Sequence, residues 1–221
     1  MTTVQRRAAL EEIAGWVRQQ TTGTEPLLVG IDGVDGAGKT VFADELAGIL
    51  QAEVAVVRAS VDGFHQPAAA RHRRGRGSPE GFFLDSYDYV SLRQLLLDPL
   101  RGEAPHEIVR ASYDVHREQP VERAVESVPA DAVLIFDGIF LHREELRGYW
   151  DLSVFLDVPF EISIPRGAAR GYGDPDPAAP SNHRYLNGQR LYLQRCQPAQ
   201  LATIVVDNRD LAAPQIMVHR C

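Results

Sequence analysis

Residues 27–50 read LLVGIDGVDGAGKTVFADELAGIL, and this stretch decides the fold. An apolar run leads into the loop Gly33-Val34-Asp35-Gly36-Ala37-Gly38-Lys39-Thr40, which fits G-x-x-x-x-G-K-[ST] at every fixed position. An amphipathic segment follows, so the motif lies between a predicted strand and a predicted helix. That context separates a phosphate-binding loop from a chance match, and it argues against a glycine-rich turn with an incidental lysine.

The composition of this loop suits a bound phosphate chain. Glycines carry no Cβ, so the backbone can turn tightly and point successive N–H groups inward around an anion. The helix that begins at about Lys39 adds the positive end of its dipole. We expect Lys39 to reach the β- and γ-phosphates and the Thr40 hydroxyl to ligate Mg²⁺. The predicted nucleotide-binding residues of the loop are Gly33, Asp35, Gly36, Ala37, Gly38, Lys39, Thr40 and Val41.

Lysine usage singles out the same loop. The chain has 23 Lys plus Arg, and reading it through finds one lysine, Lys39, so the other 22 are arginines. Arginine therefore supplies positive charge elsewhere, whereas a compact, rotatable ammonium group is kept for the loop.

Length and composition limit the remaining possibilities. At 221 residues and 44% hydrophobic content, the chain can bury one substantial core, and we expect a single domain. A net charge of −7 argues against a nucleic-acid partner bound through bulk electrostatics. The N-terminal segment lacks the apolar core of a signal peptide, and no apolar run reaches membrane-spanning length. Two cysteines, Cys196 and Cys221, give no disulfide framework, so we expect a soluble cytoplasmic protein without a membrane partner.

Apolar runs alternate with amphipathic segments along the chain. Helical spacing predicts helices over 4–20, 40–51 and 89–100. Buried strands are predicted over 27–31, 54–57, 132–138, 152–157 and 203–207, with a further short strand over 107–113. Because the long strands are apolar throughout, both of their faces must be covered. The pattern therefore predicts a three-layer P-loop α/β fold with a parallel five-stranded sheet between helices.

Three acids follow predicted strands. Open parallel sheets bind ligands beyond the carboxyl ends of their strands, where Asp62, Asp137 and Asp157 lie. An acid at a strand end can also merely cap the next element, and for Asp157 that interpretation is as good as any other. A kinase needs one carboxylate to hold Mg²⁺ or its waters and another to take the proton of the acceptor hydroxyl. We expect Asp62 and Asp137 to meet these needs.

Arginines are the other requirement of a kinase. Guanidinium groups stabilise the charge of the transferring phosphoryl group, and they often arrive on a lid that closes over the site. Residues 166–195 are less apolar than the core and contain a Gly-Asp-Pro-Asp-Pro kink, so we expect them to form such a lid. Its arginines Arg166, Arg170 and Arg184 are candidates for phosphate contact, with solvated surface charge as the alternative.

A second group of arginines lies in the polar stretch between residues 71 and 79. This stretch is predicted to be a mobile surface excursion, because it combines glycine, proline and charge. Its arginines could also meet phosphate, although a solvated charge run is the default interpretation. They are Arg71, Arg73, Arg74 and Arg76.

Four segments, in their order and spacing, resemble a known family. They read GVDGAGKT, VDGFHQP, SPEGFFLDSYD and VLIFDGIFLHREELRGYWDLSVFLDVP. Over about residues 27–207 they are similar to the uridine kinase, phosphoribulokinase and bacterial pantothenate kinase family, with the nearest likeness to bacterial uridine kinase-like proteins. The phosphate loop is shared with many families, whereas the second and third segments are more specific and favour small-molecule kinases.

The resemblance implies roles for individual residues. Asp62 falls on the proposed general base for the acceptor hydroxyl, and Asp137 falls on the acid that closes the family's Walker B-like strand, which is usually Glu in uridine kinases. Asp85 falls on the acid that holds ribose hydroxyls, and Tyr113 falls on a tyrosine that packs near the nucleobase.

The lid and the base-reading residue match less closely. Arg166 and Arg170 fall on the family's arginines after the fourth strand, and Arg184 is a further nucleotide-binding candidate in the lid. The family's pyrimidine-reading histidine lies farther beyond its Tyr-Asp pair than His116 does here. These departures lie where the acceptor is recognised, so they bear on the substrate more than on the transfer. The resulting candidates are Asp62, Lys39, Arg166 and Arg170 for catalysis, Asp62, Asp85, Tyr113, His116 and Arg170 for the acceptor, and Thr40 and Asp137 for the metal.

The sequence therefore predicts a kinase that uses ATP and Mg²⁺ to phosphorylate a hydroxyl of a small metabolite, with the 5′-hydroxyl of uridine or cytidine favoured. Other acceptors, such as pantothenate or a sugar phosphate, are alternatives, and so is a regulatory module that binds nucleotide without transferring phosphate. A GTPase is excluded, because its Asn-Lys-x-Asp segment needs a second lysine. The choice between ATP and GTP and the formation of a homo-oligomer stay open.

Overall fold

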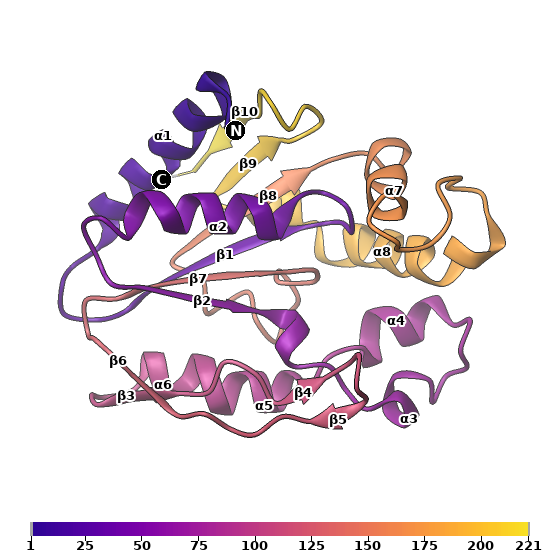
Figure 1. Cartoon of the computed structure of the whole chain (residues 1–221), viewed down its shortest axis with the longest axis horizontal. Helices are drawn as coiled ribbons and strands as arrows, with labels where there is room; N and C mark the ends of the chain where they lie inside the picture. The colour runs from indigo at the N-terminus through magenta and orange to yellow at the C-terminus, as the bar shows by residue number, and fades with distance from the viewer. Residues whose placement is uncertain (1, 221) are drawn as a thin grey trace.

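The computed structural model describes residues 2–220, and an open sheet forms its centre (Figure 1). The strand order is β10-β9-β8-β1-β7-β2. Five of these strands run parallel, so the predicted parallel core of a three-layer α/β fold is confirmed. They are β1 (Leu27–Gly33), β2 (Val56–Ser60), β7 (Val133–Gly138), β8 (Leu152–Asp157) and β9 (Ile204–Asp207).

The expected number of strands was wrong, because a sixth strand closes one edge of the sheet. β10 (Gln215–His219) pairs antiparallel with β9. Its residues alternate between exposed and partly buried, so it lacks the continuous apolar run that marks the buried strands. The ring of His219 stacks on that of Trp16 with centroids 3.8 Å apart, which fastens this edge to the N-terminal helix.

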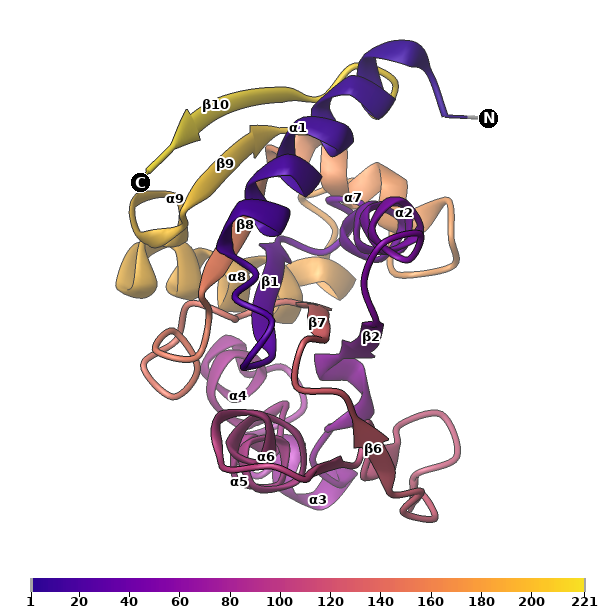
Figure 2. The ribbon, with the colours of Figure 1, turned by 90° about the vertical axis from the view of Figure 1, so that its left-hand side faces the viewer.

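Two helices cover one face of the sheet (Figure 2). They are α1 (Val4–Gln20) and α2 (Lys39–Leu50). Ile13 of α1, Phe42 of α2 and Val29 of β1 belong to one buried apolar cluster. The helical spacing of their apolar residues therefore matches the face that each helix buries.

The opposite face is covered by helices from later parts of the chain. α8 (His183–Cys196) packs closely against α4 (Pro79–Asp85), and Tyr192 joins Phe136 of β7 in the second apolar cluster. The predicted helix over 89–100 is a continuous helical stretch with one π-helical segment. It consists of α5 (Tyr89–Leu92), η2 (Arg93–Leu97) and α6 (Asp98–Arg101).

Several predicted boundaries differ from the structure. The second strand begins two residues later than expected, and the expected short strand over 107–113 is divided between two small sheets. These sheets pair β3 (His106–Ile108) with β6 (Glu126–Val128) and β4 (Tyr113–Asp114) with β5 (Gln119–Pro120). The remaining short elements are η1 (Val61–Gly63), α3 (Ala68–Arg71) and α9 (Pro198–Leu201).

The expected lid over residues 166–195 is only partly a surface segment. It starts in α7 (Phe160–Ala168), continues through a loop to η3 (Pro180–Asn182), and ends in α8. Tyr192 of α8 is 1% exposed, so this helix belongs to the core rather than to a mobile flap. The prediction was wrong there because α8 is polar except for a narrow apolar stripe.

Two expectations concerned membrane-spanning helices and the two cysteines. Among residues 2–220, no helix combines the length and the apolar character needed to cross a membrane. Cys221 lies outside the described residues. Burial raises the pKa of the Cys196 thiol on α8, so this cysteine is held in its neutral form.

Candidate nucleotide and acceptor site

The predicted phosphate loop connects β1 to α2. Gly36 and Gly38 have φ values of 76° and 94°, in the left-handed region that favours glycine. A Cβ on Gly36 would lie 2.0 Å from the carbonyl oxygen of Ser163, so α7 presses directly on the loop. The Lys39 Nζ donates a hydrogen bond of 3.0 Å to the Val34 carbonyl and lies back over the loop. The geometry fits an anion cradle made of backbone N–H groups.

A buried polar network supports the loop at its start. Asp32, the penultimate residue of β1, is fully buried and accepts the Gly33 N–H at 2.7 Å through Oδ1. Its Oδ2 accepts from the Tyr192 hydroxyl and lies 2.6 Å from the Nδ1 of His142. The other ring nitrogen of His142 lies 3.0 Å from the Ser153 hydroxyl. The sequence analysis missed this network, although an acid inside an apolar strand is a signal that it needs buried partners.

Two side chains from distant parts of the chain hold the loop backbone. Gln189 of α8 accepts the Asp35 N–H at 2.7 Å through its Oε1. Asn208 follows β9, is fully buried, and donates from Nδ2 to the Ala37 carbonyl at 2.7 Å. Neither residue was predicted, because each acts through a tertiary contact that no local motif records. The loop is therefore fixed by α8 on one side and by the end of β9 on the other.

The two predicted metal ligands lie together. The Thr40 hydroxyl donates to Asp137 Oδ2 at 2.7 Å, and Asp137 is 2% exposed at the end of β7. Hydroxyl and carboxylate oxygens suit Mg²⁺, which takes one or two protein ligands and completes its shell with water and phosphate. Arg58 of β2, which the sequence analysis missed, donates to Asp137 Oδ1 at 2.9 Å and orients this carboxylate.

Asp62 lies on η1, at the same sheet edge as the phosphate loop. A Cβ on Gly138 would be 2.4 Å from Val61 Cγ1, so the turn carrying Asp62 packs directly on the end of β7. The Tyr87 hydroxyl donates to Asp62 Oδ1 at 3.2 Å. Burial and the nearby carboxylates of Asp62 and Asp35 raise the pKa of Tyr87 well above its ordinary value, so the phenol stays protonated as a donor.

The charges of Asp62 and of the loop influence one another. The pKa of the Asp35 carboxyl is raised, mainly because burial disfavours its charged form. Lys39 lowers that pKa by attraction, whereas Asp62 adds to the rise by repulsion. Asp35 therefore lies close enough to both Lys39 and Asp62 for their charges to act on it, and the role of Asp62 as a base stays a prediction.

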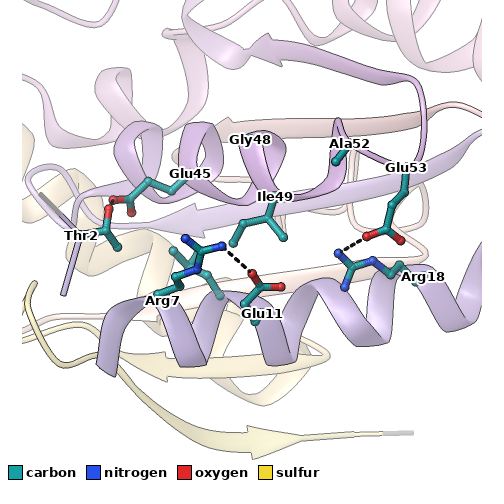
Figure 3. A pocket seen from close by; sticks show the side chains of 10 residues that line it. Thr2, Arg7, Glu11, Arg18, Glu45, Gly48, Ile49, Ala52 and Glu53 are labelled. Atoms are coloured by element: carbon teal, nitrogen blue, oxygen red, sulfur yellow. Dashed lines mark hydrogen bonds and ion pairs between the residues drawn. The ribbon is translucent and has the colours of Figure 1, made fainter. Parts of the chain in front are cut away.

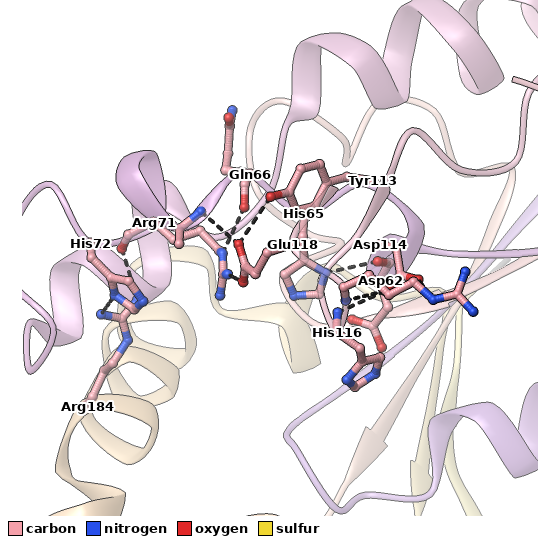
Figure 4. A network of polar contacts seen from close by, with 12 residues as sticks. Asp62, His65, Gln66, Arg71, His72, Tyr113, Asp114, His116, Glu118 and Arg184 are labelled. Carbon is pink, nitrogen blue, oxygen red and sulfur yellow. Dashed lines mark hydrogen bonds and ion pairs between the residues drawn. The ribbon is translucent and has the colours of Figure 1, made fainter. Parts of the chain in front are cut away.

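Tyr113 and His116, two of the predicted acceptor residues, lie with Asp62 on the acceptor lobe, which residues 61–128 form (Figure 4). The Tyr113 hydroxyl donates to Glu118 Oε2 at 3.1 Å. The backbone N–H of His116 donates to Asp114 Oδ1 at 2.9 Å, while the His116 side chain is exposed. Asp85 is held differently from the expected ribose-binding acid, because its two oxygens pair with arginines. These are Arg73 and, at 2.9 Å, Arg74.

The predicted phosphate-binding arginines are divided between two places. Arg166 of α7 donates to the carbonyls of Asn208 and Arg209, beside the phosphate loop, and Arg170 is exposed one turn farther on. Arg184 instead donates to carbonyls of the 71–76 segment, so the structure does not bring it to the phosphate loop. The same contacts show that the 71–76 segment is held in place rather than left as a free excursion.

A cavity of about 480 Å³ between α1 and α2 lies apart from this site (Figure 3). Ion pairs line it, with Arg7–Glu11 at 3.3 Å and Arg18–Glu53 at 2.8 Å. Its cations are already paired and its walls are helix side chains, so it has no ring of backbone donors for phosphate. The carboxyl ends of the parallel strands, where the phosphate loop lies, remain the better candidate for nucleotide binding.

The sequence matches one family over most of the region that forms this edge. The model of the Phosphoribulokinase / Uridine kinase family matches residues 28–172. The chain belongs to this family. As a member of a kinase family with relatives named uridine kinase, it is a phosphotransferase.

Individual relatives of the family agree with this placement. A uridine kinase from Brevibacillus brevis is 28% identical over 185 residues, which cover 79% of this chain and 81% of the relative. A uridine kinase from Lactobacillus helveticus is 25% identical over 146 residues, covering 66% and 68%. The solved structure of a possible uridine kinase from Bacillus stearothermophilus has a TM-score of 0.72 at 23% identity and covers 90% of this chain and 97% of that one. At that identity the structural likeness concerns the fold.

Proposed function

We propose that the protein transfers the γ-phosphoryl group of ATP to a hydroxyl of a small metabolite, with Mg²⁺. The phosphate loop and Lys39 bind the β- and γ-phosphates, and Lys39 leaves the Val34 carbonyl to do so. Thr40 and Asp137 are the residues that would hold Mg²⁺, and the ion would supply positive charge against the developing phosphate charge. Arg166 of α7 and Arg170, two residues after that helix ends, add positive charge during transfer.

Asp62 is the general base of this mechanism. Its carboxylate accepts the proton of the acceptor hydroxyl, and the hydroxyl oxygen forms a bond to the γ-phosphorus. The bond between that phosphorus and the bridging oxygen to the β-phosphate breaks, and ADP leaves. The Tyr87 hydroxyl orients Asp62 through the bond at 3.2 Å. The observation that carries the proposal is the position of this carboxylate. Val61, the neighbour of Asp62, packs on Gly138, and the adjacent Asp137 accepts from Thr40 of the phosphate loop.

Two classes of acceptor follow from the comparisons and the site. The relatives named uridine kinase make the 5′-hydroxyl of a pyrimidine nucleoside the first candidate, with Asp85, Tyr113 and His116 as its proposed contacts. The second class is an anionic acceptor, such as a sugar phosphate or pantothenate. One observation favours this second class. Both oxygens of Asp85 pair with arginines, so this carboxylate is not free to accept from ribose hydroxyls, whereas the arginines can bind an anion.

An acceptor screen tests the proposed transfer. Purified protein is mixed with Mg–ATP and with uridine, cytidine, pantothenate or sugar phosphates, and ADP release is measured. We expect little release without an acceptor and rapid release with one of them. A protein that hydrolyses ATP equally with and without every acceptor would instead be a nucleotide-operated regulatory module.

A substitution then tests the proposed base. Asp62→Asn should lower kcat by about 10²- to 10⁴-fold, because the positioned proton acceptor is lost. The dissociation constant for Mg–ATP should stay close to that of the wild type. Asp131→Asn, at an exposed turn before β7, is the matched control. Full turnover by Asp62→Asn would remove Asp62 from this role.

A further inference from the structure

Positive charge is concentrated on the acceptor side of the site. The whole chain has a net charge of −7, yet residues 71–76 read RHRRGR. The carboxylates that pair with these arginines are Asp85, bound by Arg73 and Arg74, and Glu118, bound by Arg71. Two acids thus face a segment with four arginines, and the segment keeps a net positive charge.

Asp85 anchors two guanidinium groups without covering them. The Asp85 side chain is 2% exposed, whereas the side chains of Arg73 and Arg74 are 63% and 43% exposed. Each guanidinium has five N–H donors in a rigid fork, and the contact with one carboxylate oxygen leaves most of them available. The buried carboxylate therefore holds a pair of preoriented donors at the surface of the lobe.

A fifth arginine fixes the backbone of this segment from within. Arg184 of α8 is 8% exposed and donates to three carbonyls, those of Arg71 at 3.1 Å, Gly75 at 3.3 Å and Arg76 at 2.8 Å. The positive segment is consequently a built part of the structure. It does not have to be ordered when a ligand binds, so its charge is available at low entropic cost.

The far side of the same segment is positive as well. A cavity of about 730 Å³ separates Arg76 from residues 177–190 of the loop and α8. Arg76, Arg184, Arg190 and His183 line it, and none of the lining residues within the described range 2–220 is Asp or Glu. Cationic groups on both sides of one segment attract an anionic ligand to this lobe.

The paired arginines lie on the segment next to the proposed base. Gln66 and Ser86 are joined by a backbone hydrogen bond of 2.9 Å, so the chain leaving Asp85 runs beside the chain leaving Asp62. Tyr87, two residues after Asp85, donates to Asp62 at 3.2 Å. An acceptor held by the arginines would therefore be bound on the same lobe as the base that activates its hydroxyl.

We propose that the acceptor carries a phosphate monoester or carboxylate group, which Arg73 and Arg74 bind while its hydroxyl meets Asp62. This inference rests on the proposed phosphoryl transfer, and it decides between the two acceptor classes named above. Arginine forks match phosphate and carboxylate oxygens in geometry and in charge. A neutral nucleoside offers these guanidinium groups no negative charge, and its ribose hydroxyls would have to compete with them for the oxygens of Asp85.

The experiment compares acceptors and two arginine variants. Wild type, Arg73→Gln and Arg7→Gln are assayed with uridine, cytidine, pantothenate, glycerate and several sugar phosphates, and thermal unfolding and the KM for ATP are measured alongside. Arg73 is the better target of the pair because Arg74 still neutralises the buried Asp85 in the variant. Arg7 lies on α1 with its side chain 71% exposed, which makes it a matched control.

An anionic acceptor should give the highest kcat/KM of the panel. Arg73→Gln should lower that value by about 10- to 100-fold, since a charge-assisted hydrogen bond is lost. The KM for ATP and the unfolding temperature should stay near those of Arg7→Gln. Uridine or cytidine as the best acceptor, or equal kcat/KM in the two variants, overturns the inference and leaves the proposed transfer intact. A folded, ATP-binding protein that phosphorylates no acceptor overturns the proposed function and the inference with it.

Discussion

Gly36 illustrates how much of the phosphate loop depends on a single residue. Its φ of 76° is costly for a residue with a Cβ, and that Cβ would lie 2.0 Å from the carbonyl oxygen of Ser163. The contact is with backbone, so no side chain can move to relieve it. The glycine at this position thus serves the packing of α7 on the loop as well as the turn itself.

Gly36→Ala should therefore disrupt the loop. We expect the dissociation constant for Mg–ATP to rise by at least about 10-fold, because the loop amides leave their positions. Gly48→Ala is the matched control, since it lies in α2 with nothing within 4 Å of its added Cβ. The control should bind ATP normally and gain up to about 1 kcal/mol of helix stability. Isothermal titration and thermal unfolding measure both effects, and equal ATP affinity in the two variants would contradict the expectation.

His65 gives the protein a predicted dependence of stability on pH. Burial lowers its pKa below the ordinary value of 6.5, and it outweighs the opposing hydrogen bond to the Asp62 carbonyl and the attraction of the Asp62 charge. Arg71 and His116 lower the pKa further. Below pH 6.5 the unfolded chain therefore binds more protons at this position than the folded protein does, and folding stability falls as the pH falls.

The variant His65→Gln removes this titration. From about pH 7.5 to about pH 5.5, the free energy of unfolding of the wild type should fall by more than that of His65→Gln, because only the wild type has the histidine to protonate. Chemical denaturation at several pH values measures the difference. His183→Gln, at an exposed position, should follow the wild type. Parallel curves for the wild type and His65→Gln would show that this histidine does not contribute.

The residues of the site divide into those that a motif reveals and those that it cannot. The loop from Gly33 to Thr40 was predictable because its members are consecutive and their spacing has a chemical reason. Gln189 and Asn208 were not, since they reach the loop from positions 154 and 171 residues away from their partners. Asp85 was found as a candidate, but its pairing with two arginines depends on how the loop before α4 folds.

At the scale of elements, α8 links the loop after α7 to the phosphate loop. Its first turn carries Arg184, which holds the 71–76 segment, and its middle carries Gln189, which accepts the Asp35 N–H at 2.7 Å. One turn later, Tyr192 donates to the buried Asp32. A single helix thus contacts the acceptor lobe, the phosphate loop and the end of β1.

Gln189→Ala tests the contact between α8 and the phosphate loop. The loss of one hydrogen bond, worth about 1 kcal/mol, should raise the KM for ATP by about 3- to 10-fold. Gln194→Ala, exposed on the same helix, is the control and should leave that KM unchanged. Steady-state kinetics at varied ATP give the comparison. If the two variants share the KM of the wild type, the contact has no part in nucleotide binding.

The buried elements were easier to predict from the sequence than the partly exposed ones. Strands with apolar residues on both faces, such as β7 and β8, were predicted to within a residue of their observed bounds. β10 was missed because an edge strand packs on one face and its pattern resembles an exposed segment. α8 was assigned to a lid because the Pro- and Asp-rich loop before it dominates the local composition. Its few buried residues, including Tyr192, are buried through packing against α4, which the sequence does not record.

At the scale of the whole molecule, the sheet ends in the antiparallel strand β10 on one side and in the parallel strand β2 on the other. β10 hydrogen-bonds to β9, and the Trp16–His219 stack ties this edge to α1. Without β10 the backbone groups of β9 would be free to pair with another chain. The antiparallel strand β10 therefore keeps the backbone groups of β9 from pairing with another chain.

A chain that stops after Ala213 should be less stable and should self-associate. We expect a lower unfolding temperature and concentration-dependent light scattering, because β9 becomes an open edge. His219→Ala is the matched control, since it keeps β10 and loses only the ring stack, a change of about 0.5–1.5 kcal/mol. A shortened chain that stays monomeric and melts with the wild type would show that β10 is dispensable.

The solitary ε-amine at Lys39, resting on the Val34 carbonyl, offers a chemical reporter of occupancy. Amine-selective acylating reagents have only this side chain and the α-amino group to modify. A bound triphosphate would engage that nitrogen and slow its acylation, so one modified peptide in a mass spectrum would record how full the loop is.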